Sequence, residues 1–234
     1  MSGMRTVLLL LFLLSSTGIT VSAQSGGNAT GNDGGSIPGE AQRRNRQEVA
    51  AAQARLPDPA LQREALRLIE SILQHGDERF VERNEAIVTS LLLPPRIAGS
   101  PRFERSFPHI RIEAAKLAAR LDTPGSAAAL TTTLAEDKDP AVQAAAARLL
   151  PSMDSVKPHE VAALLGRTLA AENRGDRHDS RLVSAIIEGG YTLYRRWGTE
   201  DSRLVRAILE VREGPYSRET RRMAGRFVEL LLDG

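Results

Sequence analysis

The chain of 234 residues contains no cysteine, and aromatic residues make up only 4% of it. Without cysteine it can form no disulfide, no cysteine-ligated zinc site and no thiol nucleophile. A lipoprotein anchor is excluded as well, because the lipid is attached to a cysteine at the cleavage point. Lysine is almost as rare, since Lys116, Lys138 and Lys157 are the only ones. Arginine therefore supplies nearly all of the positive charge, and it keeps that charge at any accessible pH.

Long apolar runs are also absent. The run from Val7 to Leu14 is far shorter than the roughly 20 residues that a membrane span needs. It follows Arg5 and precedes the small-residue site Val21-Ser22-Ala23, an order typical of a secretory signal peptide. We expect residues 1–23 to be removed on export, leaving a periplasmic, envelope-associated or secreted protein without a membrane span. An uncleaved N-terminal anchor is the alternative.

Overall charge gives little indication of a partner. The formal net charge is +2 and charged residues make up 26% of the chain, which is ordinary for a globular protein, so charge alone does not argue for nucleic acid. Residues 24–40 are rich in glycine and polar side chains, and Ala41 to Gln53 is polar but compatible with a helix. We therefore expect residues 24–54 to be a flexible linker with room for a short helix, and residues 55–234 to be the folded domain.

Within that domain, four segments repeat one pattern of small and apolar positions. They begin near Pro59, Pro108, Pro140 and Glu219, and the positions follow at steps of four, three, one and three residues. The second position is always alanine: Ala65, Ala114, Ala146 and Ala224. A basic residue always precedes the third position: Arg67, Lys116, Arg148 and Arg226. These steps predict one stripe along an α-helix, and the repetition is typical of stacked helical repeats.

The rest of the domain reads as helices separated by proline and glycine. No alternating run is long enough to predict a strand, so the fold class is all-α. We expect helices over 59–74, 78–93, 108–121, 126–134, 140–150, 159–171, 180–197, 201–211 and 217–232, with a loop over 94–108 that is either an insertion or functional. Pro151 should end its helix, making Met153 the weakest member of the stripe. A degenerate copy of the repeat near Leu182 contains Gly189-Gly190, which can allow two helices to approach closely.

The segment from Asp139 to Leu150, with aspartate and proline before an alanine-rich helix, resembles the first helix of a HEAT repeat. Asp58-Pro59 and Phe107-Pro108 open similar segments. The resemblance covers about residues 55–234, although the repeats are unevenly spaced. It implies a right-handed α-solenoid of antiparallel HEAT-like helix pairs that binds macromolecules, and it supplies no catalytic residues to carry over.

No catalytic, metal or cofactor site emerges from the sequence. The histidines, His75, His109, His159 and His178, lack a close ligand spacing. There is no nucleophile elbow, phosphate loop or dinucleotide fingerprint. We interpret the stretch from Asp176 to Asp179, which surrounds His178, as a solvated turn, and Glu188 as an exposed helix position. We therefore expect no enzyme.

The best candidate for a binding site is a cluster near the end of the 180–197 helix. It contains Tyr191, Tyr194, Arg195, Arg196 and Trp197. Tyrosine, tryptophan and arginine are the residue types that dominate binding hot spots. The alternative is that the rings pack beneath the final helix, against Phe227.

The leading functional hypothesis is thus a non-enzymatic module or scaffold that binds a protein or peptide. The alternative is a HEAT-like nucleic-acid-binding protein or enzyme with an arginine-lined groove. Its candidate residues are Arg167, Arg174, Arg177, Arg181, Arg203 and Arg206. Export and the near balance of charge argue against that alternative, and a repeat protein handling a chromophore lacks a supporting cysteine. The charge on the inner helical face would distinguish the protein-binding hypothesis from the nucleic-acid hypothesis, because a continuous basic groove favours nucleic acid and a mixed or apolar one favours protein.

Overall fold

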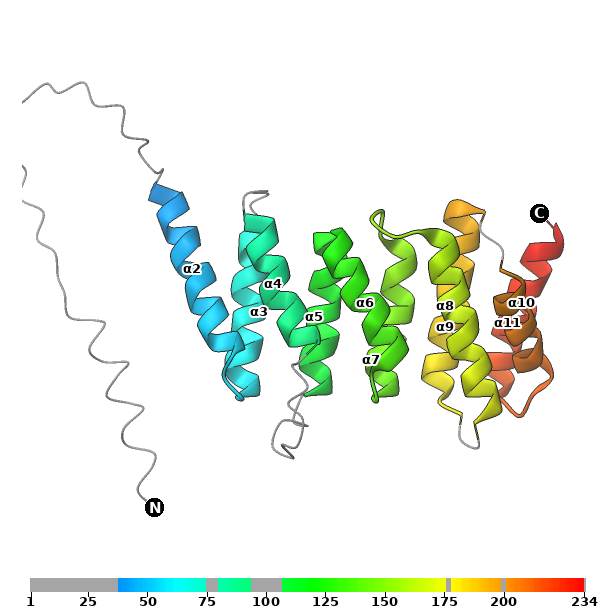
Figure 1. Ribbon diagram of the computed structural model, residues 1–234. Helices are drawn as coiled ribbons and strands as arrows, with labels where there is room; N and C mark the ends of the chain where they lie inside the picture. The colour runs from blue at the N-terminus through cyan, green and yellow to red at the C-terminus, as the bar shows by residue number, and fades with distance from the viewer. Residues whose placement is uncertain (1–37, 75–79, 94–106, 176–177, 199–200, 234) are drawn as a thin grey trace, which may run out of the picture. The chain divides into compact units, whose positions relative to one another are not determined.

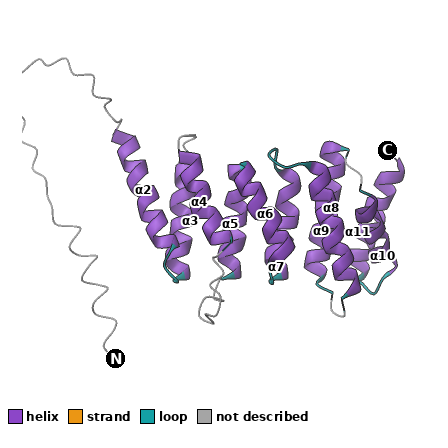
Figure 2. Ribbon diagram, in the orientation of Figure 1, coloured by secondary structure: helices purple, strands orange, loops and turns teal. Residues whose placement is uncertain are grey.

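The computed structural model describes residues 38–74, 80–93, 107–175, 178–198 and 201–233. Throughout these ranges the regular elements are helices and no strand occurs (Figures 1 and 2), which confirms the all-α prediction. The elements are α2 (Pro38–Ala54), α3 (Pro59–Leu73), α4 (Val81–Leu92), α5 (Pro108–Leu121), α6 (Pro124–Glu136), α7 (Pro140–Leu149), the 3-10 turn η2 (Leu150–Ser152), α8 (Pro158–Arg174), α9 (Ser180–Trp197), α10 (Ser202–Glu213) and α11 (Arg218–Asp233).

The helices pack in two rows. In the odd row, α3, α5, α7, α9 and α11 each contact the next member. In the even row, α2, α4, α6, α8 and α10 do the same, and the two rows pack against each other. Each helix therefore has neighbours from both rows, and the core lies between the rows.

The repeated stripe faces this core. The four repeat alanines, Ala65, Ala114, Ala146 and Ala224, are each 0% exposed. Because a packed core leaves little space around a fully buried methyl group, alanine allows the odd-row helices to approach their neighbours closely. The basic residues before the third position, from Arg67 to Arg226, are all exposed. The predicted register is therefore correct.

Capping residues explain where the helices begin. Asp58, Asp139, Asp179 and Asp201 each precede a helix and accept hydrogen bonds from its first backbone N–H groups. Thr123 forms a capping box with Ser126 before α6, so this helix starts at Pro124, two residues before the predicted start. Such caps satisfy donors that have no partner inside the helix.

Proline and glycine act largely as expected. Pro151 ends α7, which gives way to η2, but Met153 is only 1% exposed and is not a weak member of the stripe. A Cβ atom on Gly189 would lie 2.5 Å from the Ala147 carbonyl oxygen of α7, so close approach of the two helices requires glycine there. Gly166 plays the same part in the even row, where a Cβ would lie 2.7 Å from the backbone nitrogen of Leu204.

One ion pair is almost completely buried. Arg111 of α5 donates from Nε and Nη2 to the two carboxylate oxygens of Asp137, at 2.8 and 3.0 Å. The two side chains are 9% and 10% exposed. Asp137 also accepts from the backbone N–H of Asp139, so this pair joins α5 to the connection between α6 and α7.

The sequence predicted that the folded domain begins at residue 55, but the helical body begins earlier, at Pro38. The segment 38–54, which we expected to be linker with a short helix, is the helix α2, packed on α3 and α4. Its Gln47 donates to the Asn84 side chain at 2.7 Å and to the Phe80 carbonyl at 3.1 Å. The expected signal peptide, the linker up to residue 37 and the loop from 94 to 106 lie outside the described residues.

Candidate interaction site

The predicted aromatic cluster lies at the C-terminal end of α9, but its members have different environments. Tyr191 is 43% exposed and Trp197 is 41% exposed. Tyr194 is half-buried against the core. Gly190, one residue before Tyr191, is the position that faces Phe227, since a Cβ atom there would lie 3.6 Å from the ring. The alternative, in which the rings pack beneath the final helix, is therefore wrong for Tyr191 and Trp197.

Each exposed ring has an arginine from the same helix beside it. The guanidinium carbon of Arg195 lies 6.0 Å from the Tyr191 ring centroid. The Arg196 guanidinium carbon lies 4.9 Å from the Trp197 centroid. Such cation–π contacts restrict the rings while leaving part of each surface open to a partner.

Arg196 also has an internal role that the sequence did not reveal. Its guanidinium donates to the carbonyl oxygen of Ser152 and to the Asp154 carboxylate. These groups lie just after α7, so Arg196 ties the end of α9 to the connection that follows α7. We therefore assign Arg196 to positioning Trp197 rather than to direct binding.

Asp122 holds the same connection from the other side. It adopts a left-handed conformation (φ 47°) and accepts hydrogen bonds from the backbone N–H groups of Asp154 and Ser155, both at 2.9 Å. Partial burial raises the pKa of Asp122. The two N–H donors, the Ser155 hydroxyl and the charge of Arg196 outweigh that effect and bring its pKa below the ordinary value of 3.8.

His178 is not an exposed side chain of a solvated turn, as the sequence suggested. Asp176 and Arg177 lie outside the described residues, but the His178 ring is partly buried, 4.9 Å from the Tyr216 ring centroid. Tyr216 donates from its hydroxyl to the Asn173 side chain at 2.5 Å. Asn173 in turn donates to the Ala207 carbonyl at 2.9 Å and to the Glu210 carboxylate at 3.0 Å.

This polar cluster fastens α8 to α10 and to the start of α11. Burial, with smaller contributions from the charges of Glu172 and Glu210, raises the pKa of Tyr216 to about 12. The hydroxyl thus stays protonated and continues to donate at any physiological pH. Because Asn173 has partners for both its oxygen and its nitrogen, the cluster has the arrangement of a structural contact.

The two rows differ in surface charge. On the described odd-row helices the exposed basic side chains are Arg67, Lys116, Arg120, Arg148, Arg181, Arg195, Arg196, Arg218, Arg221, Arg222 and Arg226, whereas the exposed acidic ones are Glu188, Glu219 and Glu229. On the even row, exposed Arg44, Arg83, Arg167, Arg174, Arg203, Arg206 and Arg212 are offset by Glu48, Glu82, Glu136, Glu160, Glu210 and Glu213. The excess of positive charge thus belongs to the odd row.

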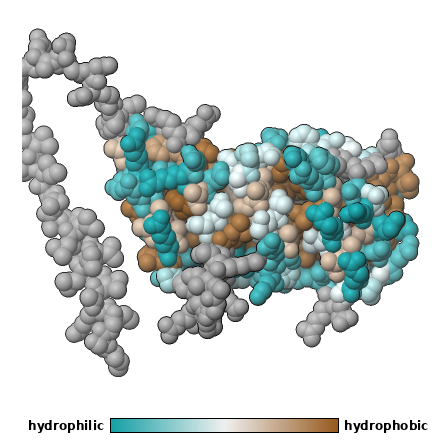
Figure 3. All heavy atoms as spheres, in the orientation of Figure 1, coloured by the Kyte–Doolittle hydropathy of each residue, from teal (hydrophilic) through white to brown (hydrophobic). Residues whose placement is uncertain are grey.

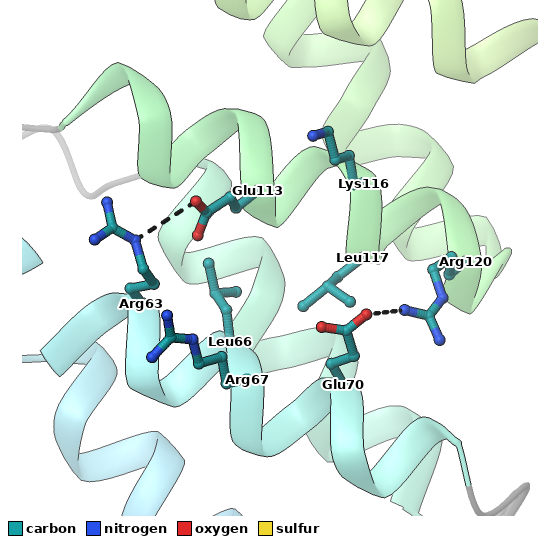
Figure 4. A pocket seen from close by; sticks show the side chains of 8 residues that line it. All are labelled: Arg63, Leu66, Arg67, Glu70, Glu113, Lys116, Leu117 and Arg120. Atoms are coloured by element: carbon teal, nitrogen blue, oxygen red, sulfur yellow. Dashed lines mark hydrogen bonds and ion pairs between the residues drawn. The ribbon is translucent and has the colours of Figure 1, made fainter. Parts of the chain in front are cut away.

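A shallow depression of about 360 Å³ lies between α3 and α5 on the odd row (Figure 4). Two ion pairs bridge these helices, Arg63 with Glu113 at 3.5 Å and Arg120 with Glu70 at 2.6 Å. Arg67 pairs with Glu64 on its own helix at 3.4 Å. Most of the charge in this depression is therefore neutralised locally.

A second depression, of about 470 Å³, lies on α11. Arg218, Glu219, Arg222, Met223 and Arg226 line it. In contrast to the first depression, none of its arginines forms an ion pair with a described residue. The sequence marks Arg226 only as a member of the repeat pattern and predicts no site here, although the spacing of four residues places these arginines on one side of a helix.

Other types of site find little support in the described part of the chain. No three histidine, aspartate or glutamate side chains gather there in a way that could hold a metal ion, and no helix there is long and apolar enough to cross a membrane. On the face shown in Figure 3, hydrophilic and hydrophobic side chains are mixed.

Comparison with known proteins adds no relative. No protein-family model, no curated protein and no solved structure matches the chain. A function for this chain can therefore be inferred only from its own residues.

Proposed function

We propose that the protein is a non-enzymatic interaction module, exported to the periplasm, the cell envelope or the medium, that binds a protein or peptide. In this proposal the helices form a right-handed α-solenoid of HEAT-like antiparallel pairs, α2–α3, α4–α5, α6–α7, α8–α9 and α10–α11. Each of these pairs is in contact, whereas α7 makes little contact with α8 and α9 makes little contact with α10. The two rows and the buried repeat alanines support that assignment. Such stacks present side chains on a rigid frame, which suits binding to extended partners.

The observation that carries the proposal is the exposure of two large aromatic side chains at one end of α9. The chain has one tryptophan and three tyrosines, yet Trp197 and Tyr191 each keep about two fifths of their surface open. Arg195 and Arg196 lie beside these rings, which reduces the conformational freedom that the rings lose on binding. Ordered aromatic side chains of this kind are typical hot spots of protein interfaces.

The nucleic-acid alternative is weaker. Most of the candidate arginines of this alternative lie on the even row. Arg167, Arg174, Arg203 and Arg206 are exposed there, but acidic side chains such as Glu160 and Glu210 alternate with them. A duplex-binding groove needs a continuous run of basic residues to neutralise successive phosphates. Arg181 lies on α9, in the other row, and Arg177 lies outside the described residues.

Site-specific photo-crosslinking in the native host tests the proposal. A benzophenone side chain would replace Tyr191 or Trp197, with Leu56 as the matched control because it is apolar and similarly exposed, at 46%. We expect positions 191 and 197, but not 56, to yield one discrete protein adduct. Identical products at all three positions, adducts with nucleic acid, or no adduct at any position would contradict the proposal.

A further inference from the structure

The final helix carries a line of arginines on its exposed side. Arg218, Arg222 and Arg226, here called the arginine row, are separated by four residues each, and Arg221 lies beside them. At a rise of about 1.5 Å per residue, neighbouring members stand about 6 Å apart along the helix. They line the 470 Å³ depression together with Met223 and Glu219.

The arginine row is unfavourable for the helix itself. Like charges four residues apart repel each other, and positive charges near a helix N-terminus also oppose the helix dipole. Elsewhere on the odd row, Arg63, Arg120 and Arg148 each have a carboxylate within 3.5 Å on a neighbouring helix. No member of the arginine row has such a partner among the described residues. Glu219, which lines the same depression three residues before Arg222, offsets part of this repulsion. A bound anionic group would relieve the rest.

We propose that the arginine row binds an acidic segment of the protein partner, one that presents carboxylates about 6–7 Å apart. This inference rests on the proposed function, because it names the chemistry of that partner. Carboxylates at every fourth residue of a helix have this spacing, and so do those at alternate residues of an extended strand. The planar guanidinium groups can hold each carboxylate through two parallel hydrogen bonds.

The surroundings of the row favour a peptide over the other polyanions. Partly exposed Met223 provides an apolar contact for peptide side chains between the arginines. The apolar face of α11 cannot enter a lipid surface, because Ala224 and Phe227 are buried in the core at 0% and 3% exposure. A strand of nucleic acid would require aromatic side chains for base stacking, and no exposed residue of the described part of α11 is aromatic.

Fluorescence anisotropy with labelled decaglutamate tests the inference on the full chain. The R222Q/R226Q variant removes two charges of the row. The matched control R167Q/R174Q removes two exposed charges from α8, and R222K/R226K keeps the charge while losing the two-pronged geometry. We expect R222Q/R226Q to weaken binding about tenfold or more, R222K/R226K to lie in between, and R167Q/R174Q to change it less than about twofold. Thermal melting of each variant establishes that it is folded.

Other outcomes would overturn the inference. Equal losses in the two glutamine variants would mean that decaglutamate senses only net charge. Tighter binding of a ten-nucleotide single-stranded DNA, or binding to phosphatidylglycerol vesicles but not to decaglutamate, would assign the row to nucleic acid or to a membrane. Decaglutamate could also fail to bind the unaltered protein while the adduct at position 191 forms unchanged in R222Q/R226Q. In that case the interaction module stands and only the acidic partner segment is refuted.

Discussion

The first two helices of the odd row and its last helix both expose arginine, but they treat its charge differently. Between α3 and α5, Arg63 and Arg120 reach carboxylates on the opposite helix, so their charges help to align the helices. On α11, Arg222 and Arg226 have no such partner among the described residues. The same residue type thus joins two helices in one region and forms no ion pair with a described residue in the other.

This comparison implies that, beyond the hydrogen bond of Tyr216 just before it, α11 is held in place by apolar burial. Phe227 is 3% exposed, and its ring packs near Gly190 of α9. Phe227→Ala should lower the free energy of unfolding by about 3–5 kcal/mol, as expected for a buried aromatic residue. Arg226→Gln, one residue earlier but exposed, should change it by less than about 0.5 kcal/mol. Urea denaturation measures both, and similar losses in the two variants would show that charge anchors α11 after all.

How far these features could be predicted from sequence depends on how local they are. The stripe of Ala65, Ala114, Ala146 and Ala224 was predictable because helical periodicity is written in neighbouring residues. The exposed aromatic pair was found as a local cluster of rare residue types. The arginine row was equally local, and its spacing of four residues could have revealed it.

Contacts between distant segments could not be predicted in this way. The docking of α2 depends on Gln47 meeting Asn84, and α2 itself has few large apolar side chains to signal burial. The partial burial of His178 depends on Tyr216, which comes much later in the chain. The internal role of Arg196 likewise needs the position of Ser152 after α7. Each of these contacts becomes visible only once the helices are stacked.

Asp122 allows the contribution of paired charges to be measured through pH. Because its pKa in the folded protein lies below the ordinary 3.8, its ionised form adds stability above about pH 4. That contribution is lost as the pH falls through the lowered value. Asp122→Asn, which also tolerates the left-handed conformation, should therefore be less stable than the unaltered protein at pH 7, and the difference should shrink below about pH 4. Urea denaturation over a pH series measures this, and a difference that stays constant down to pH 2 would exclude the role of the ionised carboxylate.

The smallest expected changes in unfolding free energy come from removing one exposed arginine in each region. They separate the two regions most directly, because their signs differ. Arg120→Gln removes the exposed pair with Glu70 and should destabilise the protein by about 0.2–1 kcal/mol at low salt. Arg222→Gln removes the repulsion from Arg218 and Arg226, so it should be neutral or should stabilise by about 0.2–0.5 kcal/mol.

Salt provides the control for both variants, since screening weakens attraction and repulsion between exposed charges alike. The two differences in unfolding free energy, measured in urea at low salt, should therefore approach zero in about 1 M sodium chloride. If Arg222→Gln instead destabilises the protein at low salt, Arg222 has a stabilising partner within the fold. The arginine row would then resemble the paired charges of α3 and α5, and the argument for an acidic ligand would lose its basis.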